Sequence, residues 1–141
     1  MIKEHAQVPQ GSVLGPLLFC CLINDLSTCL DANTECHMYM YADDTNIIVA
    51  SSNLHEIEHH LNNVASACAE WCLINRMVIN TSKTKVMIMS SRKGIFDTTV
   101  RVRQSGSLLD QVESAKILGI FVSSDITTVQ NTVDSHAVQK N

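Results

Sequence analysis

The sequence predicts an α+β fold, with helices packed on an antiparallel sheet, and three observations support this prediction. An apolar run after a loop rich in Gly and Pro predicts a helix over residues 17–26. Alternating side chains predict a β-hairpin over residues 38–49. Apolar residues spaced three or four positions apart predict a second helix over residues 54–72. Helices that pack on an antiparallel sheet in this way form an α+β domain.

The length and composition fit one domain with a hydrophobic core. The chain has 141 residues, of which 45% are apolar and 17% are charged, and this excludes a solvated, disordered chain. Its start is polar and shows no signal peptide, and its longest apolar stretch, over residues 13–23, is interrupted and too short to cross a bilayer. We therefore expect an intracellular protein with no membrane span. None of its cysteines forms a Cys-x-x-Cys pair, so we expect them to be reduced, buried thiols. The six cysteines are Cys20, Cys21, Cys29, Cys36, Cys68 and Cys72.

The net charge of −4 is unevenly distributed along the chain. Up to Asn75 there are nine acids and one base, whereas residues 76–116 carry eight bases and three acids. An acidic half that holds a metal beside a basic half that contacts phosphates would suit a nucleic-acid enzyme. Ordinary surface charge explains the same distribution equally well. The acidic total argues against tight nucleic-acid binding by this chain alone.

The first helix follows a loop over residues 8–16 that contains two Gly and two Pro. Gly11 and Gly15 permit a close approach of the backbone to a ligand. Pro16 occupies what would be the first helical position, and the apolar residues after it predict a mostly buried helix.

The predicted hairpin carries two adjacent acids, Asp43 and Asp44, at its tip. Met38 and Met40 fall on one face of its first strand, and Tyr39 and Tyr41 on the other. Neighbouring carboxylates repel each other, and Mg²⁺ prefers oxygen ligands of this type. An Asp-rich turn left in water is the alternative interpretation.

The second helix should begin after Asn53, with Asn53 and Glu56 forming a capping box. Its first turns also contain His55-Glu56-x-x-His59, which matches the zinc-protease pattern. The two histidines fall away from the apolar face, and Glu56 has the competing capping role. A chance occurrence of the pattern is therefore the main interpretation, and a zinc protease is a remote alternative.

Shorter strands should follow the second helix. The patterns predict a strand over residues 86–89, an edge strand over residues 98–103 that residues 104–107 break, and a last hairpin from residues 112–114 and 116–122. Beyond Ser123 the sequence is polar, and residues 123–141 are expected to form a poorly ordered tail.

Together, these blocks resemble the palm of reverse transcriptases from non-LTR retrotransposons. Residues 8–19 and 23–26 look like the family's motif B, and residues 41–45 look like motif C, its catalytic hairpin. Motif D is matched by Trp71, Asn75, Ile79, Asn80, Lys83 and Thr84, with Ile79 where Leu is more usual. Residues 116–120 look like the primer grip, motif E, with Ile117 in place of an aromatic residue. The resemblance covers residues 8–122, so a partial palm over residues 1–122 is expected.

The resemblance implies template-directed nucleotidyl transfer with two Mg²⁺ ions, using an RNA template, a DNA primer and a deoxynucleotide. Asp43 would be the stronger metal ligand and Asp44 the auxiliary one. Lys83 would lie near the departing pyrophosphate. The residues that would contact template, primer or nascent base pair are Gln10, Gly11, Tyr41 and Ala42.

One part of the family pattern is missing. Motif A, a strand with a further metal-binding Asp, lies upstream of motif B, and only seven residues precede Val8 here. A site that lacks this carboxylate should bind Mg²⁺ poorly, so we expect the fragment to be inactive alone, with a missing N-terminal portion as a candidate partner. A degenerate domain that acts as a nucleic-acid or protein interaction module is the alternative function.

Overall fold

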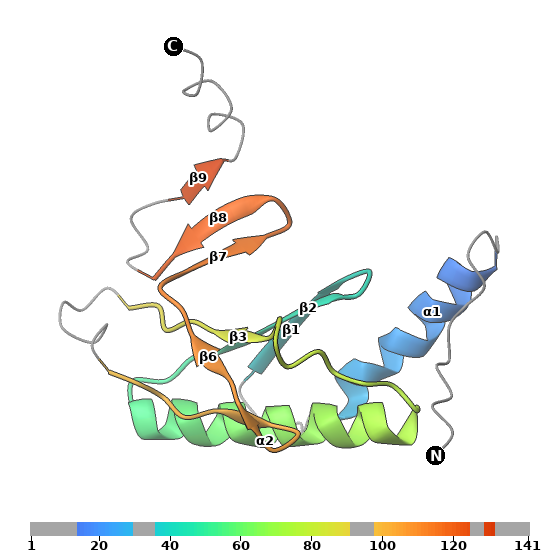
Figure 1. The fold of residues 1–141 in the computed structure, drawn as a ribbon, viewed down its shortest axis with the longest axis horizontal. Coiled ribbons are helices and arrows are strands. Elements are labelled where there is room, and N and C mark those ends of the chain that lie inside the picture. Colours follow the sequence, from blue (N-terminus) through green and yellow to red (C-terminus); the bar gives the residue numbers. More distant parts are fainter. Residues whose placement is uncertain (1–13, 30–35, 91–97, 125–128, 132–141) are drawn as a thin grey trace, which may run out of the picture. The chain divides into compact units, whose positions relative to one another are not determined.

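The chain forms two compact units in the computed structural model (Figure 1). One comprises residues 1–80 and 102–107, and the other comprises residues 81–101 and 108–141. Within them, the structure describes residues 14–29, 36–90, 98–124 and 129–131. Of the helices in these described ranges, none has the length and apolar character that crossing a membrane requires.

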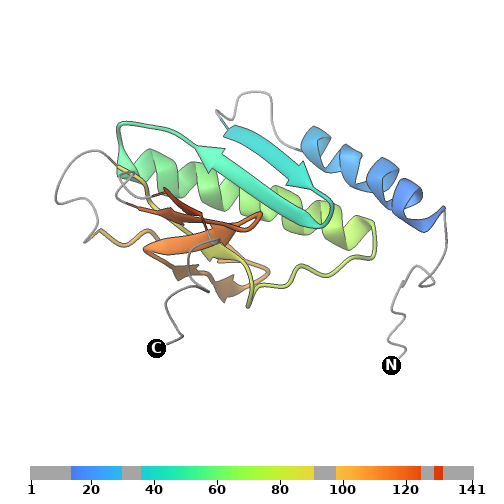
Figure 2. The same cartoon turned by 90° about the horizontal axis from the view of Figure 1, so that it is seen from above.

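The first unit is built from helices, one long hairpin and a short strand. Its elements are α1 (Gly15–Asn24), the 3₁₀ helix η1 (Asp25–Cys29), β1 (Cys36–Tyr41), β2 (Asp44–Val49), α2 (Leu54–Ile74) and β4 (Arg103–Gln104). The hairpin of β1 and β2 lies along α2 (Figure 2). The combination of helices with antiparallel strands agrees with the α+β prediction.

The hairpin is confirmed, and β1 begins two residues earlier than predicted. The strands pair antiparallel from Cys36 opposite Val49 to Tyr41 opposite Asp44. Met38 and Met40 are half-buried against the core, while the tyrosines of β1 are exposed. The predicted alternation of two faces is therefore confirmed, and the structure shows that the methionine face packs on the core while the tyrosine face is exposed.

The core of this unit lies where α2 meets η1 and the hairpin. Leu26, Val64, Cys68 and Trp71 are buried together there. Half-buried apolar side chains surround them: Ile23, Cys36, Met38, Met40, Ile47, Cys72, Met77 and Ile79. Three of the four buried residues come from one face of α2, which confirms its amphipathic pattern.

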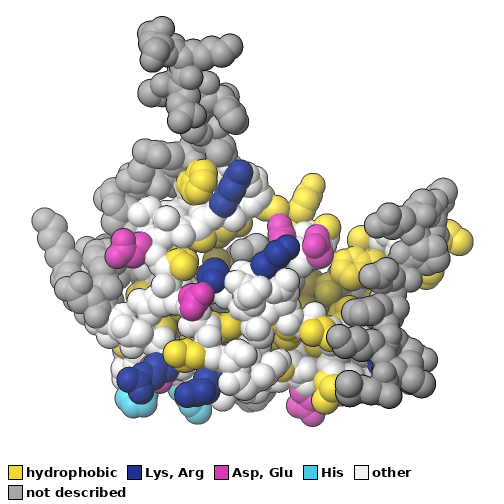
Figure 3. Space-filling model, in the orientation of Figure 1, with side chains coloured by type: hydrophobic (Ala, Val, Ile, Leu, Met, Phe, Trp, Pro, Cys, Tyr) yellow, Lys and Arg dark blue, Asp and Glu magenta, His cyan; other side chains and the backbone are white. Residues whose placement is uncertain are grey.

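The start of α2 is capped through a three-residue relay instead of the predicted capping box. Asn53 Oδ1 accepts a hydrogen bond of 3.0 Å from the backbone N–H of His55. The N–H of Asn53 donates to Ser51 Oγ at 3.1 Å, and Ser51 Oγ donates to Glu56 Oε2 at 2.6 Å. Glu56 thus acts on the cap through Ser51, because the serine hydroxyl can both accept and donate. Histidine side chains lie on the outer surface over α2 (Figure 3).

The prediction that the first helix is mostly buried is wrong. Leu17 and Leu18 are 61% and 64% exposed, and Gly15 is the only buried residue of α1. Cys20 and Cys21 are exposed as well, contrary to the expectation of buried thiols. The core is reached only near the C-terminal end of α1, through Ile23, and by Leu26 of η1. An apolar composition therefore did not ensure burial here.

The second unit contains short strands. They are β3 (Lys85–Val86), β6 (Asp110–Gln111), β7 (Ser114–Ile117), β8 (Ile120–Ser123) and β9 (Val129–Asn131). The short strand β5 (Ser107–Leu108) begins in the first unit, where it pairs with β4. β3 and β6 run parallel, whereas β7, β8 and β9 form an antiparallel sheet. A last hairpin is present, but its strands differ from the prediction: the turn lies at Leu118 and Gly119, inside the run over residues 116–122 that was predicted as one strand. β9 lies within the segment expected to be a poorly ordered tail.

Two strand predictions need correction. The strand predicted over residues 86–89 is reduced to β3, and most of the edge strand predicted over residues 98–103 has no strand partner. Instead, the Gln111 side chain forms hydrogen bonds with the backbone of residues 98–100. Its Nε2 donates to the Thr98 carbonyl at 3.0 Å, and its Oε1 accepts from the Val100 N–H at 2.9 Å. A side-chain amide replaces a strand partner here.

The break predicted over residues 104–107 is a two-residue turn between strands: Gln104 ends β4, and Ser107 begins β5. Ser105 and Gly106 both have positive φ, of 50° and 82°, as in the type I′ turns that connect tightly paired strands. Gln104 is buried before this turn, and its Oε1 has no hydrogen-bond partner among the described residues.

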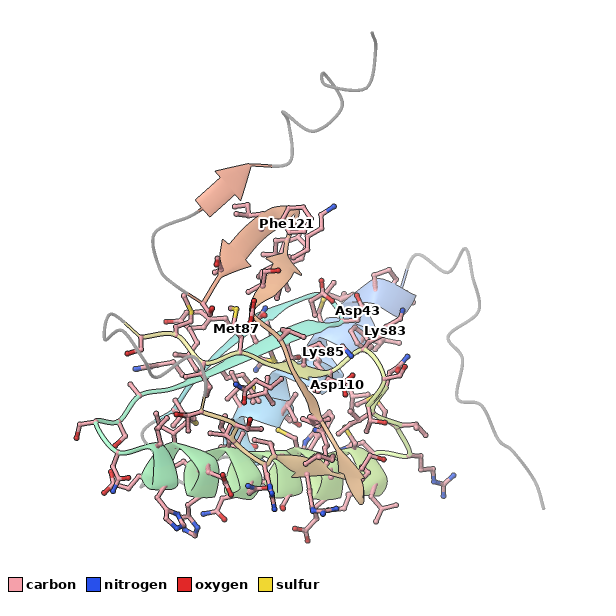
Figure 4. The ribbon with its side chains drawn as sticks, turned by 60° about the vertical axis from the view of Figure 1, so that its left-hand side comes forward. Asp43, Lys83, Lys85, Met87, Asp110 and Phe121 are labelled. Atoms are coloured by element: carbon pink, nitrogen blue, oxygen red, sulfur yellow. The ribbon has the colours of Figure 1, made fainter. Side chains whose placement is uncertain are left out.

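The ion pair of Lys85 with Asp110 joins β3 to β6 and provides a titration test of this unit. Lys85 Nζ donates to Asp110 Oδ2 at 2.7 Å (Figure 4). This hydrogen bond and the lysine charge lower the pKa of Asp110. The pair therefore stabilises the fold at pH values above the unfolded pKa of Asp110, about 3.9, and this contribution is lost as the pH falls through the lower folded pKa.

An NMR titration should give a midpoint for Asp110 below about 3.9, and Lys85→Met should return it to that value. An unshifted midpoint in the unsubstituted chain would contradict the ion pair.

Candidate functional site

The hairpin tip places two carboxylates in solvent. Tyr41 and Asp44 pair as the last rung of the hairpin, so Ala42 and Asp43 form a two-residue loop. Asp43 and Asp44 are both exposed, and Asp43 lies at the tip (Figure 4). Both adjacent acids are thus accessible to solvent.

The loop backbone is strained at one residue. Ala42 has φ 51°, whereas Asp43 has no positive φ. A positive φ at the first of the two central residues is the pattern of a type II′ turn, which normally carries Gly at that position. Sequence reasoning placed the turn correctly but could not show this conformation of Ala42.

The carboxylates at the tip can hold a hard divalent cation. Both are oxygen donors exposed to solvent, and Mg²⁺ is often held by one or two carboxylates together with waters or phosphates. In the described part of the chain, no group of three or more His, Cys, Asp or Glu residues could hold a metal ion. Asp43 and Asp44 therefore fit a site that other oxygen ligands complete.

One face of the tip carries an exposed tyrosine. Tyr41 is 67% exposed and lies directly opposite Asp44 across the hairpin. Paired residues of an antiparallel hairpin project from the same face. Tyr41 and Asp44 therefore share one face at the end of β1, next to the strained loop.

The other predicted site residues lie elsewhere in the chain. Lys83 is exposed in a turn over residues 81–83, which belongs to the second unit. Gln10 and Gly11 lie outside the described residues. The structure therefore brings together Tyr41, Ala42, Asp43 and Asp44 from the predicted set.

The His55-Glu56-x-x-His59 pattern has local structural roles at the start of α2. Glu56 accepts the hydrogen bond from Ser51, and His55 N–H donates to the cap. His59 Nε2 lies 3.2 Å from Asn63 Nδ2, and its ring meets that of His60 edge to face. These contacts account for the motif residues without a bound metal.

The strain at Ala42 leads to a stability prediction. Ala42→Gly should raise the free energy of unfolding by about 0.5–1 kcal/mol, because Gly adopts positive φ without the Cβ clash. The matched control is Ala67→Gly inside α2, which should lower it by about 1 kcal/mol. Urea unfolding followed by circular dichroism measures both. A destabilising effect of Ala42→Gly would show that the loop is not strained.

Comparisons with known proteins agree on one family. The family model described as "Reverse transcriptase (RNA-dependent DNA polymerase)" matches residues 2–122. The "Probable RNA-directed DNA polymerase from transposon BS" of Drosophila melanogaster is 32% identical over 128 residues, which are 87% of this chain and 14% of that protein. The "RNA-directed DNA polymerase from mobile element jockey" of Drosophila funebris is 30% identical over 129 residues, 87% of this chain and 14% of that protein.

A third relative belongs to another retrotransposable element. The "Putative 115 kDa protein in type-1 retrotransposable element R1DM" of Drosophila melanogaster is 31% identical over 115 residues, 82% of this chain and 11% of that protein. The chain thus spans 11–14% of the length of these relatives. No solved structure matches the chain significantly.

Proposed function

Because the chain belongs to the reverse transcriptase (RNA-dependent DNA polymerase) family of non-LTR retrotransposons, we propose that it supplies the catalytic hairpin of a polymerase that copies RNA into DNA. The observation that supports this role most strongly is the exposed pair of Asp43, on the two-residue loop, and Asp44, the first residue of β2. It is the arrangement of oxygen donors in the described residues best suited to meeting a metal and a nucleotide phosphate from solvent.

The proposed reaction is nucleotidyl transfer. A primer 3′-hydroxyl attacks the α-phosphate of a deoxynucleotide, and pyrophosphate leaves. Asp43 is the main metal ligand and Asp44 the auxiliary one. When bound, Mg²⁺ would supply the positive charge that stabilises the attacking and leaving oxygens. The protein's own contribution is to hold its carboxylates and the substrate in position.

Other residues would position the substrates. Tyr41 supports the primer end, and Ala42 lets the backbone of the turn approach it. Gln10 and Gly11 contact the template and the nascent base pair. Lys83 lies near the departing pyrophosphate, where its positive charge offsets the charge that develops on the leaving oxygen.

We propose that synthesis requires polymerase segments beyond these 141 residues. The described part brings together two acids at the tip, with no third metal-binding residue beside them. The relatives are also roughly seven to nine times as long as the matched region, judged from the fraction of each that is covered. The purified chain should therefore bind Mg²⁺ weakly and extend no primer.

A chimera tests the proposed function. Residues 2–122 replace the matching segment of the jockey polymerase, and primer extension on an RNA template is measured with Mg²⁺. The chimera should extend the primer, whereas the 141-residue chain alone should not. Glu70→Gln on the exposed surface of α2 is the control and should leave extension unchanged. A folded chimera that makes no product would contradict the proposal.

A further inference from the structure

The C-terminal end of α2 carries the most exposed large apolar side chains among the described residues of the first unit. Leu73 and Ile74, the last two residues of the helix, are 77% and 74% exposed, and Val78, shortly after it, is 95% exposed. We call these three residues the α2-end surface. Cys68 and Trp71, within the preceding two turns, lie in the core instead. The helix therefore packs on the core along one face and presents apolar side chains to solvent at its end.

The backbone at this end of α2 is held by local contacts, so the exposure does not result from an unwound helix. The N–H and the Nδ2 of Asn75 both donate to the Trp71 carbonyl, at 3.0 Å and 2.9 Å. On either side of Val78, Met77 and Ile79 pack against the core. An ordered segment thus holds the Val78 side chain in solvent. Exposed apolar surfaces that gather in one place usually mark an interaction site.

We propose that the α2-end surface is a docking surface for an apolar segment of the polymerase chain that lies outside these 141 residues. This inference rests on the proposed function, because it takes the chain to work as part of a longer polymerase. The chain spans only 14% and 11% of two of its relatives. A polymerase of this family therefore has much further chain that can cover an apolar surface on the first unit.

The size of the surface favours a segment of the same chain over a second copy. A stable interface between separate chains buries about 800 Å² on each partner, supplied by about 20–30 residues. The α2-end surface offers three large apolar side chains, and the nearby exposed residues Glu70 and Arg76 are charged. A linked segment needs less area, because the linkage gives it a high effective concentration. The three side chains carry no charge, so they favour an apolar occupant.

The accessibility of these side chains in the isolated chain and in the jockey chimera tests the proposal. Hydroxyl-radical footprinting, read by mass spectrometry, reports how fast solvent-borne radicals oxidise Leu73 and Ile74. Oxidation should be several-fold slower in the chimera than in the 141-residue chain, because a docked segment shields both side chains. Equal oxidation rates in the two proteins would overturn the proposal.

A double variant provides a second measurement. Leu73→Gln combined with Ile74→Gln should leave the melting temperature of the isolated chain unchanged, since both positions are exposed and Gln is a good helix former. In the chimera, the same variant should lower the melting temperature by several degrees, because it places two amides in an apolar contact. Glu70→Gln is the matched control and should change neither protein. An unchanged melting temperature of the double-variant chimera would contradict the docking.

The outcomes also separate this inference from its alternatives. Sedimentation of the isolated chain should show a monomer, and a dimer that the double variant dissociates would overturn the proposal in favour of a second copy. Both accessibility and melting are measured without primer extension. A chimera that shields Leu73 and Ile74 but makes no product would therefore support the docking surface and contradict the proposed function alone.

Discussion

Replacing Asp43 by Asn in the chimera should reduce primer extension by at least about 10³-fold, because a ligand worth several kcal/mol of transition-state stabilisation is lost. Asn has nearly the same size but carries no negative charge, so the turn itself should persist. Asp44→Asn should have a smaller effect, of roughly 10-fold, if Asp44 is the auxiliary ligand. Single-turnover extension at saturating deoxynucleotide measures both rates.

The metal dependence of these variants separates ligand loss from misfolding. The Asp44→Asn chimera should recover part of its rate as Mg²⁺ is raised, because its remaining carboxylate binds the metal more weakly. A misfolded protein would not recover. Equal, small effects of the two substitutions would contradict the assignment of metal ligands at the tip.

Trp71→Ala should lower the free energy of unfolding of the chain by about 3–5 kcal/mol. Trp71 is 8% exposed and packs with Leu26, Val64 and Cys68 in the core of the first unit. Its removal leaves a cavity at the place where α2, η1 and the hairpin meet. A loss of this size is comparable with the total stability of many small domains, so the variant should be largely unfolded near body temperature.

Circular dichroism during urea unfolding is the suitable measurement, since Trp71 is the single tryptophan of the chain. Val78→Ala is the matched control because Val78 is 95% exposed, and its effect should stay within about 0.5 kcal/mol. Trp71→Phe should lose less than Trp71→Ala because it retains a large ring. If Trp71→Ala behaves like Val78→Ala, the core assigned to the first unit is wrong.

Much of the first unit could be predicted because its patterns are local. The alternation in β1 distinguishes Met38 and Met40 from the tyrosines, and the spacing in α2 identifies the face of Val64, Cys68 and Trp71. Both periods follow directly from strand and helix geometry. The acids at the tip could be located for the same reason, since the two strands leave only Ala42 and Asp43 between them.

Burial and partner choice were predicted less well. The apolar sequence of α1 predicted burial, yet Leu17 and Leu18 are exposed. The extended segment over residues 98–100 was predicted as a strand, but Gln111 satisfies its backbone with a side-chain amide. Such outcomes depend on which segments meet in space, and the order of residues along one segment contains little information on this.

The sequence by itself determined the helices α1 and α2, the β1–β2 hairpin with Asp43 and Asp44 at its tip, and the membership of the chain in a polymerase family. These follow from short-range periodicity and from residue identities at the motif positions. Only the tertiary structure decided that Ala42 adopts a positive φ, that Tyr39 is exposed beside Tyr41, and that Gln104 is buried. The physical reason is that exposure and backbone strain result from how distant segments pack and pair, whereas element type is largely set within a few turns of one segment.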